Sequence, residues 1–368
     1  MVDSSGKHKV LIVDDTPENI QILMETLKGE YTIVAAINGQ KALQMAAADP
    51  APDIILLDIM MPGLDGYQVC EKLKADEKTR GIPVIFVTAM SEAEDEQKGL
   101  DLGAVDYITK PIQPGLVKSR VRNHLELKQH RDHLEELVRQ RTEELVLTQD
   151  ATINSLATLA EYRDPETGGH IKRTQNYVRI LAEKLRDHPS FQGFFDDTTI
   201  EQLFKSAPLH DIGKVGVRDN ILLKPGKLTD EEFVEMKKHT LYGRDTVFRV
   251  ELELAIDVEK SFLRFAREIA YTHQEKWDGS GYPVGLKDGE IPISGRLMAL
   301  ADVYDALISR RVYKPPFTHS KAVEIITEGK GQHFDPDMVD AFLEVHEEIR
   351  MVAIEHADHD EEREALAQ

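Results

Sequence analysis

The sequence predicts a multidomain protein in which a doubly wound α/β domain with a five-stranded parallel sheet precedes a long helical stalk and an all-α domain. Three observations favour this order. Residues 9–112 alternate short Val, Ile and Leu runs with helical patterns, which is typical of buried parallel strands and their crossover helices. Residues 114–162 become rich in Leu, Glu, Arg, Lys and Gln, and residues 154–351 follow helical spacing without alternating strands. At 368 residues, the chain is also too long for one ordinary hydrophobic core.

These changes of composition predict four segments along the chain. They are the α/β domain at 1–113, the stalk at 114–153, the all-α domain at 154–351 and a tail at 352–368. Because the tail is strongly acidic, we expect it to be frayed, with His356 and His359 in solvent.

Composition excludes several classes of partner. The net charge of −21 argues against extended contact with a nucleic-acid polymer or an anionic membrane, because both need a basic surface. Small anionic ligands remain compatible, since a few cations suffice for them.

The single Cys70 cannot form an intrachain disulfide. The first residues form no apolar signal segment, and no run approaches the roughly 18 apolar residues of a membrane span, so we expect a cytoplasmic protein.

Polar residues follow the predicted strands KVLIVDD, YTIVAA, DIILLDI, PVIFVTA and DYITKPI. They are Asp14 and Asp15 after the first run, Asp58 in the third, Thr88 in the fourth and Lys110 in the fifth. In a doubly wound sheet, functional groups gather at the carboxyl ends of the strands. Three carboxylates at one edge would repel one another unless a hard divalent cation bound them. The pattern therefore predicts a magnesium site with one aspartate left to react.

This segment resembles the receiver domain of response regulators. The resemblance implies that Asp58 is the phosphoacceptor, that Asp14 and Asp15 help to hold Mg²⁺, and that Thr88 and Lys110 contact the incoming phosphoryl group. It also implies a cognate histidine kinase as partner and a switch role for Tyr107. MPGLDG after Asp58 and the Lys110-Pro111 pair, whose peptide bond is usually cis in this family, match as well. The alternative is a flavodoxin-like module with incidental acids.

The stalk carries apolar residues at positions that approximate a heptad seam. They are Leu127, Leu134, Leu137, Val138 and Leu145, with His130 and Arg141 as interruptions. This spacing predicts a long helix that pairs with its own copy in a homodimer. The alternative is a solvated spacer helix in a monomer.

The all-α segment contains histidines and acids beside apolar helical patterns. One helix breaks at PETGG, between Glu166 and His170, and the other candidates are the doublet His210-Asp211, His239, His273 and Asp302. One such histidine is usually a satisfied core residue, but this many, together with the acids, indicates a metal centre with mixed imidazole and carboxylate ligands. The Asp211 carboxylate can bridge two metals while the His210 imidazole holds one of them.

Two divalent ions can activate water and stabilise the oxygens of an in-line attack on phosphorus, which indicates phosphate hydrolysis. Cations to hold the phosphate are available in Lys214, Arg311 and Lys314.

This segment resembles an HD-GYP domain through HDIGK, KPGKLT, HQEKWDGSGYP and ALADVYDAL, in that order. The resemblance implies a metal-dependent phosphodiesterase that opens cyclic di-GMP to linear pGpG, with possible further hydrolysis to GMP. The metal ligands it implies are Glu166, His170, His210, Asp211, His239, His273 and Asp302. It places Lys214, Arg311 and Lys314 at phosphate-contacting positions and Tyr282 near the substrate. His210, Asp211 and Lys214 are the residues expected to carry catalysis.

One position departs from the family pattern. Gln274 stands where a second consecutive histidine is usual, and that histidine ligates metal in the forms with three ions. Since glutamine is a poor, neutral ligand, we expect two well-held metals, iron or manganese, rather than three.

The sequence leaves three functions open. The first is a response regulator whose phosphorylation at Asp58 adjusts a cyclic di-GMP phosphodiesterase through the stalk. The second keeps the enzyme with cyclic GMP-AMP or another cyclic dinucleotide as substrate. The third is an adaptor module that recruits partners such as cyclic di-GMP synthases through the GYP loop, WDGSGYP at residues 277–283. Trp277 in that loop can stack on a guanine or anchor the loop, and His319, His333 and His346 are not expected to be ligands.

Overall fold

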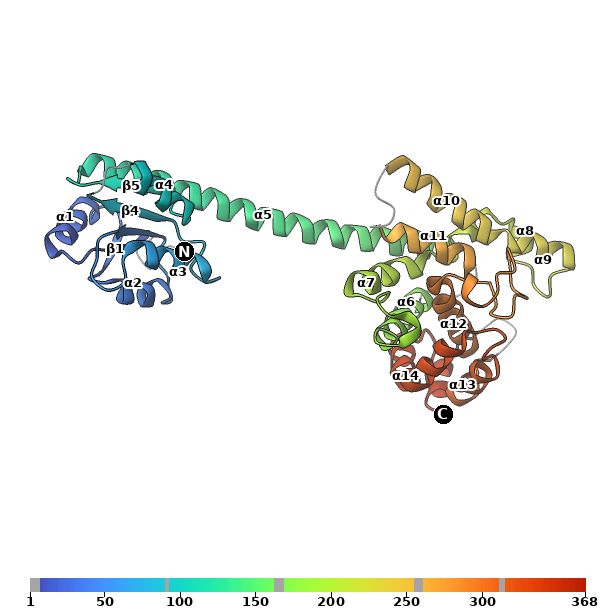
Figure 1. Ribbon diagram of the computed structural model, residues 1–368. Coiled ribbons are helices and arrows are strands. Elements are labelled where there is room, and N and C mark those ends of the chain that lie inside the picture. Colours follow the sequence, from blue (N-terminus) through green and yellow to red (C-terminus); the bar gives the residue numbers. More distant parts are fainter. Residues whose placement is uncertain (1–6, 90–92, 162–168, 255–260, 311–314) are drawn as a thin grey trace. The chain divides into compact units, whose positions relative to one another are not determined.

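The computed structural model describes residues 7–89, 93–161, 169–254, 261–310 and 315–368. The chain divides into two compact units, Met1–Glu143 and Glu144–Gln368. Figure 1 shows the helices and strands of the two units.

The first unit is built on a five-stranded sheet in which every neighbouring pair is parallel. The strands are β1 (Lys9–Val13), β2 (Thr32–Ala36), β3 (Ile54–Asp58), β4 (Val84–Thr88) and β5 (Asp106–Thr109). Their order is β2-β1-β3-β4-β5. The register pairs Val13 with Leu57 and Thr88 with Thr109, so the carboxyl ends of these strands meet at one edge. The predicted doubly wound sheet is confirmed.

Helices cover both faces of this sheet. Leu11 and Val13 face the side covered by α2 (Gly39–Ala46) and α3 (Gly66–Ala75), whereas Val10 and Ile12 face α1 (Pro17–Leu27) and the beginning of α5 (Pro114–Glu161). Helix α4 (Ala93–Asp101) precedes β5. Strand side chains alternate between faces, so a run apolar at every position is buried on both sides. Each fully buried aliphatic side chain contributes roughly 1.5–3 kcal/mol to the free energy of unfolding.

The turn after β3 depends on one glycine. A Cβ atom at Gly66 would lie 2.3 Å from the carbonyl oxygen of Asp58. The preceding residue, Asp65, caps α3 by accepting a hydrogen bond from the backbone N–H of Gln68. Gly66 therefore lets α3 begin directly beside the end of β3.

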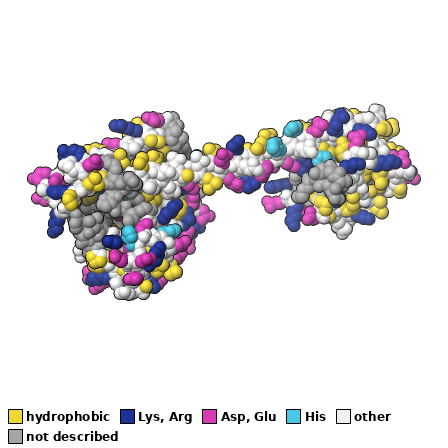
Figure 2. All heavy atoms as spheres, turned by 180° about the vertical axis from the view of Figure 1, so that it is seen from behind, with side chains coloured by type: hydrophobic (Ala, Val, Ile, Leu, Met, Phe, Trp, Pro, Cys, Tyr) yellow, Lys and Arg dark blue, Asp and Glu magenta, His cyan; other side chains and the backbone are white. Residues whose placement is uncertain are grey.

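Helix α5 contains the predicted stalk and continues through Glu161 as one helix of 48 residues. All five apolar residues of the predicted seam are exposed, and Figure 2 shows apolar side chains between charged ones along this helix. The compact units divide at Glu143, ten residues before the predicted boundary at 153. The reason is that Ile153 already packs in the second unit, against Leu209. Pairing of the stalk with a second copy stays a prediction.

The second unit is helical in its described residues, apart from one isolated bridge between Lys330 and Phe334. Its helices after α5 are α6 (Gly169–Lys184), α7 (Asp197–Ser206), α8 (Asp219–Leu222), α9 (Asp230–Lys237), α10 (His239–Leu254), α11 (Phe262–Thr272), α12 (Ile293–Ile308), α13 (His319–Glu328), α14 (Pro336–Glu355) and α15 (Asp360–Leu366). The main core includes Tyr177 and Leu181 of α6, Tyr304 of α12 and Phe342 of α14.

The expectation of a frayed tail at 352–368 is wrong. Helix α14 continues to Glu355 and is followed by α15, whose Leu366 is buried in the main core. The buried Glu362 carboxylate accepts hydrogen bonds from the backbone N–H groups of Arg310 and Asp358. The acidic composition suggested disorder, but these long-range contacts order the segment. Within the described residues, no helix combines the length and apolar character needed to cross a membrane.

Candidate metal centre and phosphoacceptor site

Three aspartates meet at the carboxyl edge of the sheet, as predicted. Asp14 and Asp58 are buried and Asp15 is exposed, and one carboxylate oxygen from each lies within 4.8 Å of the others. The ammonium nitrogen of Lys110 lies 3.0 Å from an oxygen of Asp14 and 3.0 Å from an oxygen of Asp58. The Lys110 backbone N–H donates to the carbonyl of Thr88 at 2.7 Å, which brings these two predicted residues to the same edge.

The electrostatics of this edge favour a cation. Burial raises the pKa of Asp58, the Lys110 hydrogen bond offsets part of that effect, and the Asp14 carboxylate raises the pKa further. Contacts with both carboxylates raise the pKa of Lys110 although burial opposes this, so the lysine stays charged. The Lys110-Pro111 peptide bond is cis, as expected. Clustered carboxylates suit Mg²⁺, which prefers oxygen ligands.

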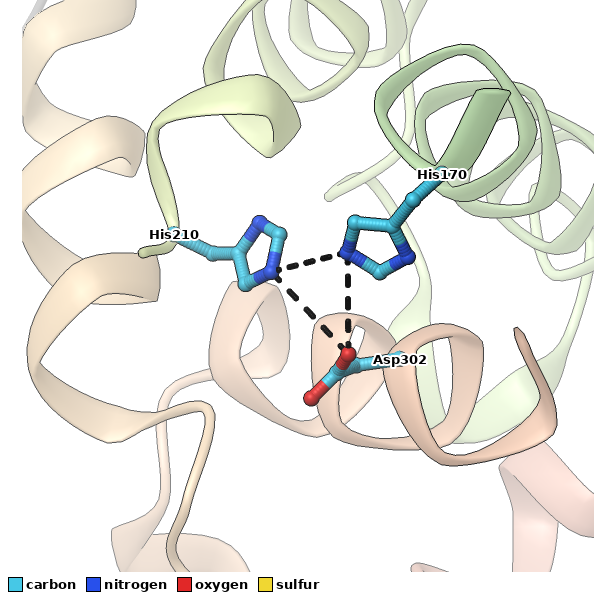
Figure 3. Close-up of side chains that lie close together, drawn as sticks. All are labelled: His170, His210 and Asp302. Carbon is cyan, nitrogen blue, oxygen red and sulfur yellow. Dashed lines mark hydrogen bonds and ion pairs between the residues drawn. The ribbon is translucent and has the colours of Figure 1, made fainter. Parts of the chain in front are cut away.

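In the second unit, His170 of α6, His210 and Asp302 of α12 form one cluster (Figure 3). The Nε2 atoms of the two histidines are 3.3 Å apart. An oxygen of Asp302 lies 3.9 Å from the Nε2 atom of His170 and 4.0 Å from that of His210. Two ligand atoms that are each about 2.1 Å from one ion can lie up to about 4.2 Å apart, so these three atoms fit a shared metal.

Asp211, His239 and His273 form a second cluster of buried side chains. The Nε2 atoms of His239 and His273 are 3.5 Å apart, and Oδ1 of Asp211 lies 3.4 and 3.5 Å from them. The other oxygen of Asp211, Oδ2, lies 3.4 Å from the Nε2 atom of His210 in the first cluster. One carboxylate thus faces both clusters, as a bridging ligand would.

The other ring nitrogens of the four histidines determine which tautomer is present. Three of the Nδ1 atoms contact backbone carbonyls at 2.8–3.0 Å: His210 with Ala207, His239 with Met236 and His273 with Ile269. The Nδ1 atom of His170 contacts the Asp305 carboxylate at 2.8 Å. Because carbonyls and carboxylates accept hydrogen bonds, each Nδ1 atom donates. A neutral imidazole that donates from Nδ1 directs its Nε2 lone pair into the cluster, where a metal ion can accept it.

Two further observations fit a cationic occupant. Oδ1 of Asp211 is buried and makes no hydrogen bond. Burial acts to raise the pKa of Asp211, but Lys214 and His210 hold it well below its usual value, so the carboxylate is charged. Burial also lowers the pKa of His239 to about 4, which keeps that imidazole neutral and able to bind metal.

The comparisons with known proteins agree with this geometry. The response regulator receiver domain matches residues 10–122, and the HD domain matches residues 154–338, half of the chain. A Vibrio cholerae protein named "Probable cyclic di-GMP phosphodiesterase" is 51% identical over 91% of this chain and 77% of its own length. A Thermotoga maritima protein named "Cyclic di-GMP phosphodiesterase" is 36% identical over 95% of this chain and 94% of its own. A Xanthomonas campestris protein named "Cyclic di-GMP phosphodiesterase response regulator RpfG" is 34% identical over 79% and 75%.

The chain belongs to the HD-domain response regulators. HD domains depend on metal, and the two clusters are groups in this one that can bind it. The clusters draw on residues from 170 to 302, so their side chains converge only in the folded chain.

In this HD-domain response regulator, Lys214 and Tyr282 lie beside the second cluster. The ammonium nitrogen of Lys214 is 2.7 Å from Oδ2 of Asp211. The ring of Tyr282 lies edge-on to His239, with centroids 6.2 Å apart, and the ammonium nitrogen of Lys237 lies 5.1 Å from the Tyr282 ring centroid. Lys237 was not predicted, because the charged pattern of α9 does not single it out. Three predicted site residues, Glu166, Arg311 and Lys314, lie outside the described residues.

The GYP loop of the HD domain is held by Glu275, another residue that was not predicted from the sequence. Its buried carboxylate accepts hydrogen bonds from the backbone N–H groups of Val284, Gly285 and Leu286 at 2.8–3.2 Å. The carbonyl of Gln274 accepts from the N–H of Tyr282 at 3.2 Å. The position of Glu275, two residues after His273, was the available signal.

Trp277, His319 and His346 have structural contacts in the second unit. The Arg296 guanidinium lies over the Trp277 ring at 5.6 Å, which favours the anchoring interpretation of this tryptophan. Both ring nitrogens of the buried His319 are partnered: Nδ1 with the Tyr304 hydroxyl at 2.8 Å and Nε2 with Nδ1 of His346 at 2.9 Å. With Glu347, His319 and His346 also form a group close enough to hold a metal ion, so their assignment as residues that do not bind metal stays a prediction.

Proposed function

We propose that this HD-domain response regulator hydrolyses cyclic di-GMP to linear pGpG, under the control of phosphorylation at Asp58. The observation that carries the proposal is the Asp211 carboxylate, which faces histidine Nε2 atoms in two adjacent clusters. A dinuclear centre of this kind suits in-line attack of water on a phosphodiester. The names of the relatives support the same reaction and substrate.

The proposed ligands divide between two ions. His170, His210 and Asp302 would hold one ion and His239 and His273 the other, and the Asp211 carboxylate, which faces both groups, would contact both ions. Iron or manganese suits this mixture of imidazole and carboxylate ligands. Gln274 replaces a ligand associated with a third ion, so two ions per chain are proposed, with Glu166 as a further ligand beside them.

The cations near the centre have separate roles in the proposal. Lys214 holds its ammonium against the Asp211 carboxylate, where it can neutralise a substrate phosphate or donate a proton to the leaving oxygen. Arg311 and Lys314 complete the phosphate contacts. Tyr282 packs against the substrate close to His239, and Lys237 adds positive charge beside it. The same centre would take pGpG onward to GMP.

Control by the receiver domain follows from the phosphoacceptor site. A histidine kinase would transfer a phosphoryl group from its own phosphohistidine to Asp58. Asp14 and Asp15 would hold Mg²⁺, and Lys110 and Thr88 would contact the phosphoryl oxygens. Helix α5 extends from the receiver sheet to the core that contains Leu209, next to His210. We propose that the exposed apolar positions of α5 pair two copies of the chain, and that phosphorylation alters this pairing.

The test is anaerobic turnover by protein purified without added metal, together with elemental analysis of the bound metal. The expected result is conversion of cyclic di-GMP to pGpG, with about two ions per chain, iron or manganese, and slower conversion of cyclic GMP-AMP. The Asp302→Ala variant is the inactive control. Full metal occupancy without hydrolysis of cyclic di-GMP would contradict the proposal and favour another cyclic dinucleotide or an adaptor role.

A further inference from the structure

Arg173 of α6 joins the C-terminal segment of the chain to the surroundings of the first metal cluster. This side chain is 1% exposed, although it is charged. Its Nη1 atom donates to the backbone carbonyl of His356 at 2.9 Å and to the carboxylate of Asp358 at 3.0 Å. A buried guanidinium is stable only when its donors are paired, so Arg173 depends on the C-terminal segment.

The opposite edge of Arg173 holds a carboxylate that contacts a candidate metal ligand. Nε and Nη2 of Arg173 donate to the two oxygens of Asp305 at 2.7 and 2.9 Å. The same carboxylate accepts a hydrogen bond from Nδ1 of His170 at 2.8 Å. A carboxylate in this position fixes the orientation of a metal-binding imidazole and raises its basicity.

Asp358 also reaches the beginning of the helix that carries His170. Its two carboxylate oxygens lie 3.2 and 3.3 Å from the backbone nitrogen of Gly169, the first residue of α6. A Cβ atom at Gly169 would lie 2.6 Å from the Asp358 carboxylate and 2.5 Å from the His356 carbonyl. Residue 169 must therefore lack a side chain for the C-terminal segment to approach this closely.

The C-terminal segment is itself held in place. Glu362 accepts hydrogen bonds from the N–H groups of Asp358 and His359, Arg363 donates to the carbonyl of Ala357 at 2.7 Å, and Leu366 is buried in the main core. Asp358 is thus presented to Arg173 from a fixed backbone.

We infer that the C-terminal segment is part of the support of the metal centre, with Asp358, Arg173 and Asp305 acting as positioning residues for His170. The chain of contacts runs from Asp358 through Arg173 and Asp305 to the Nδ1 atom of His170. This chain of contacts does not include the second cluster, because the Nδ1 atoms of His239 and His273 donate to backbone carbonyls and not to Asp305. The inference rests on the metal centre of the proposed function but not on the identity of the substrate.

The test measures Mn²⁺ affinity one cluster at a time, from the spectroscopic signal of unbound Mn²⁺. Every variant also carries Asp14→Asn and Asp15→Asn, which remove two of the three carboxylates of the receiver site, so that Mn²⁺ binding there does not contribute. The His239→Ala background retains the His170 cluster, and the His170→Ala background retains the other. Asp358→Ala is added to each and compared with Asp360→Ala. Asp360 is the matched control because it lies in the same segment and its side chain is 94% exposed. It pairs with Nη1 of Arg363, whereas Nη2 of Arg363 makes the backbone contact with Ala357, so that contact does not depend on Asp360.

The expected result is that Asp358→Ala weakens Mn²⁺ binding about tenfold or more in the His239→Ala background and has no effect in the His170→Ala background. Asp360→Ala leaves both affinities unchanged. In an otherwise native chain, Arg173→Lys should weaken Mn²⁺ binding less than Arg173→Ala, because lysine retains the charge but not the bidentate contact.

Two results would overturn the inference. One is equal Mn²⁺ affinity for Asp358→Ala and Asp360→Ala in the His239→Ala background. The other is an equal loss in both backgrounds with a lower Tm, which would mean that Asp358 only stabilises the domain. Because the readout is metal affinity, a chain that binds two ions without hydrolysing cyclic di-GMP would contradict the proposed function and leave this test intact.

Discussion

Asp211 places one carboxylate oxygen 3.4 Å from the Nε2 atom of His210 and the other 3.4 Å from the Nε2 atom of His239. The two histidines belong to different clusters, so this one side chain couples them. It is also the carboxylate that meets the Lys214 ammonium.

Removing the charge of Asp211 should therefore affect both metals. The Asp211→Asn variant keeps the shape but replaces a bridging anion with a neutral amide, so we expect bound metal to fall to one ion per chain or fewer. Turnover should fall by about a thousandfold or more, because the two-metal arrangement is lost. Elemental analysis and product chromatography measure the two effects. Asp245→Asn, at an exposed position paired with Arg244, should change neither, and two retained ions in Asp211→Asn would refute the bridging role.

Glu275 should hold the GYP loop in the conformation that places Tyr282 beside the metal centre. In Glu275→Gln, an NH₂ group replaces one of the two carboxylate oxygens that accept hydrogen bonds from the backbone N–H groups of Val284, Gly285 and Leu286. Loss of these charge-assisted hydrogen bonds should cost about 1–3 kcal/mol of unfolding free energy. KM should rise, because Tyr282 lies in the same loop, while metal content stays at the wild-type level. Denaturant titration and steady-state kinetics measure this, with exposed Glu364→Gln as control. An unchanged KM would show that the loop is positioned without Glu275.

Asp58 should destabilise the metal-free receiver domain at neutral pH. Its folded pKa is raised, so the folded state holds this proton more tightly, and the free energy of unfolding contributed by the group increases as pH falls. Asp58→Asn should then stabilise the metal-free domain at pH 7 and reduce the stabilisation by Mg²⁺. Urea unfolding with and without Mg²⁺ measures both effects. The control is Asp101→Asn on α4, and a destabilised, fully Mg²⁺-responsive Asp58→Asn protein would contradict the electrostatic account.

His319 should make the HD domain sensitive to acid. Burial and the neighbouring His346 lower the pKa of His319 from 6.5 to about 4, despite Glu347 nearby. The unfolded chain then binds the proton more readily, so the contribution of this group is present above pH 6.5 and is lost as pH falls toward 4. Between pH 7 and pH 5, the wild type should lose about 1–2 kcal/mol more stability than His319→Gln. Denaturant titration of chelator-treated protein at both pH values measures the free energy of unfolding. Equal losses of stability in the wild type and in His319→Gln would exclude His319 as the cause.

Much of the site was predictable from motif order. Asp14, Asp58 and Lys110 follow apolar runs, and parallel strands bring such positions to one edge. Likewise, His170, His210, His239, His273 and Asp302 were selected from sequence and lie in two clusters in the folded chain. Their division into two groups was not predictable, because it depends on how α6, α10, α11 and α12 pack.

The tail and the support of His170 show where sequence patterns fail. Acidic composition predicted a frayed segment at 352–368, yet Glu362 and Leu366 are buried. Arg173 carried no local signal, because its partners, Asp305 and Asp358, are 132 and 185 residues away along the chain.

The sequence by itself determined the α/β and helical units, the edge of the sheet that carries the aspartates, and the residue types that can bind metal. These follow from strand periodicity, helix periodicity and side-chain chemistry, which are local properties. The tertiary structure decided which oxygen of Asp211 faces which histidine, which carboxylate orients His170, and where the C-terminal segment lies. Those relationships depend on distances between side chains that only packing of the whole unit brings within hydrogen-bonding range.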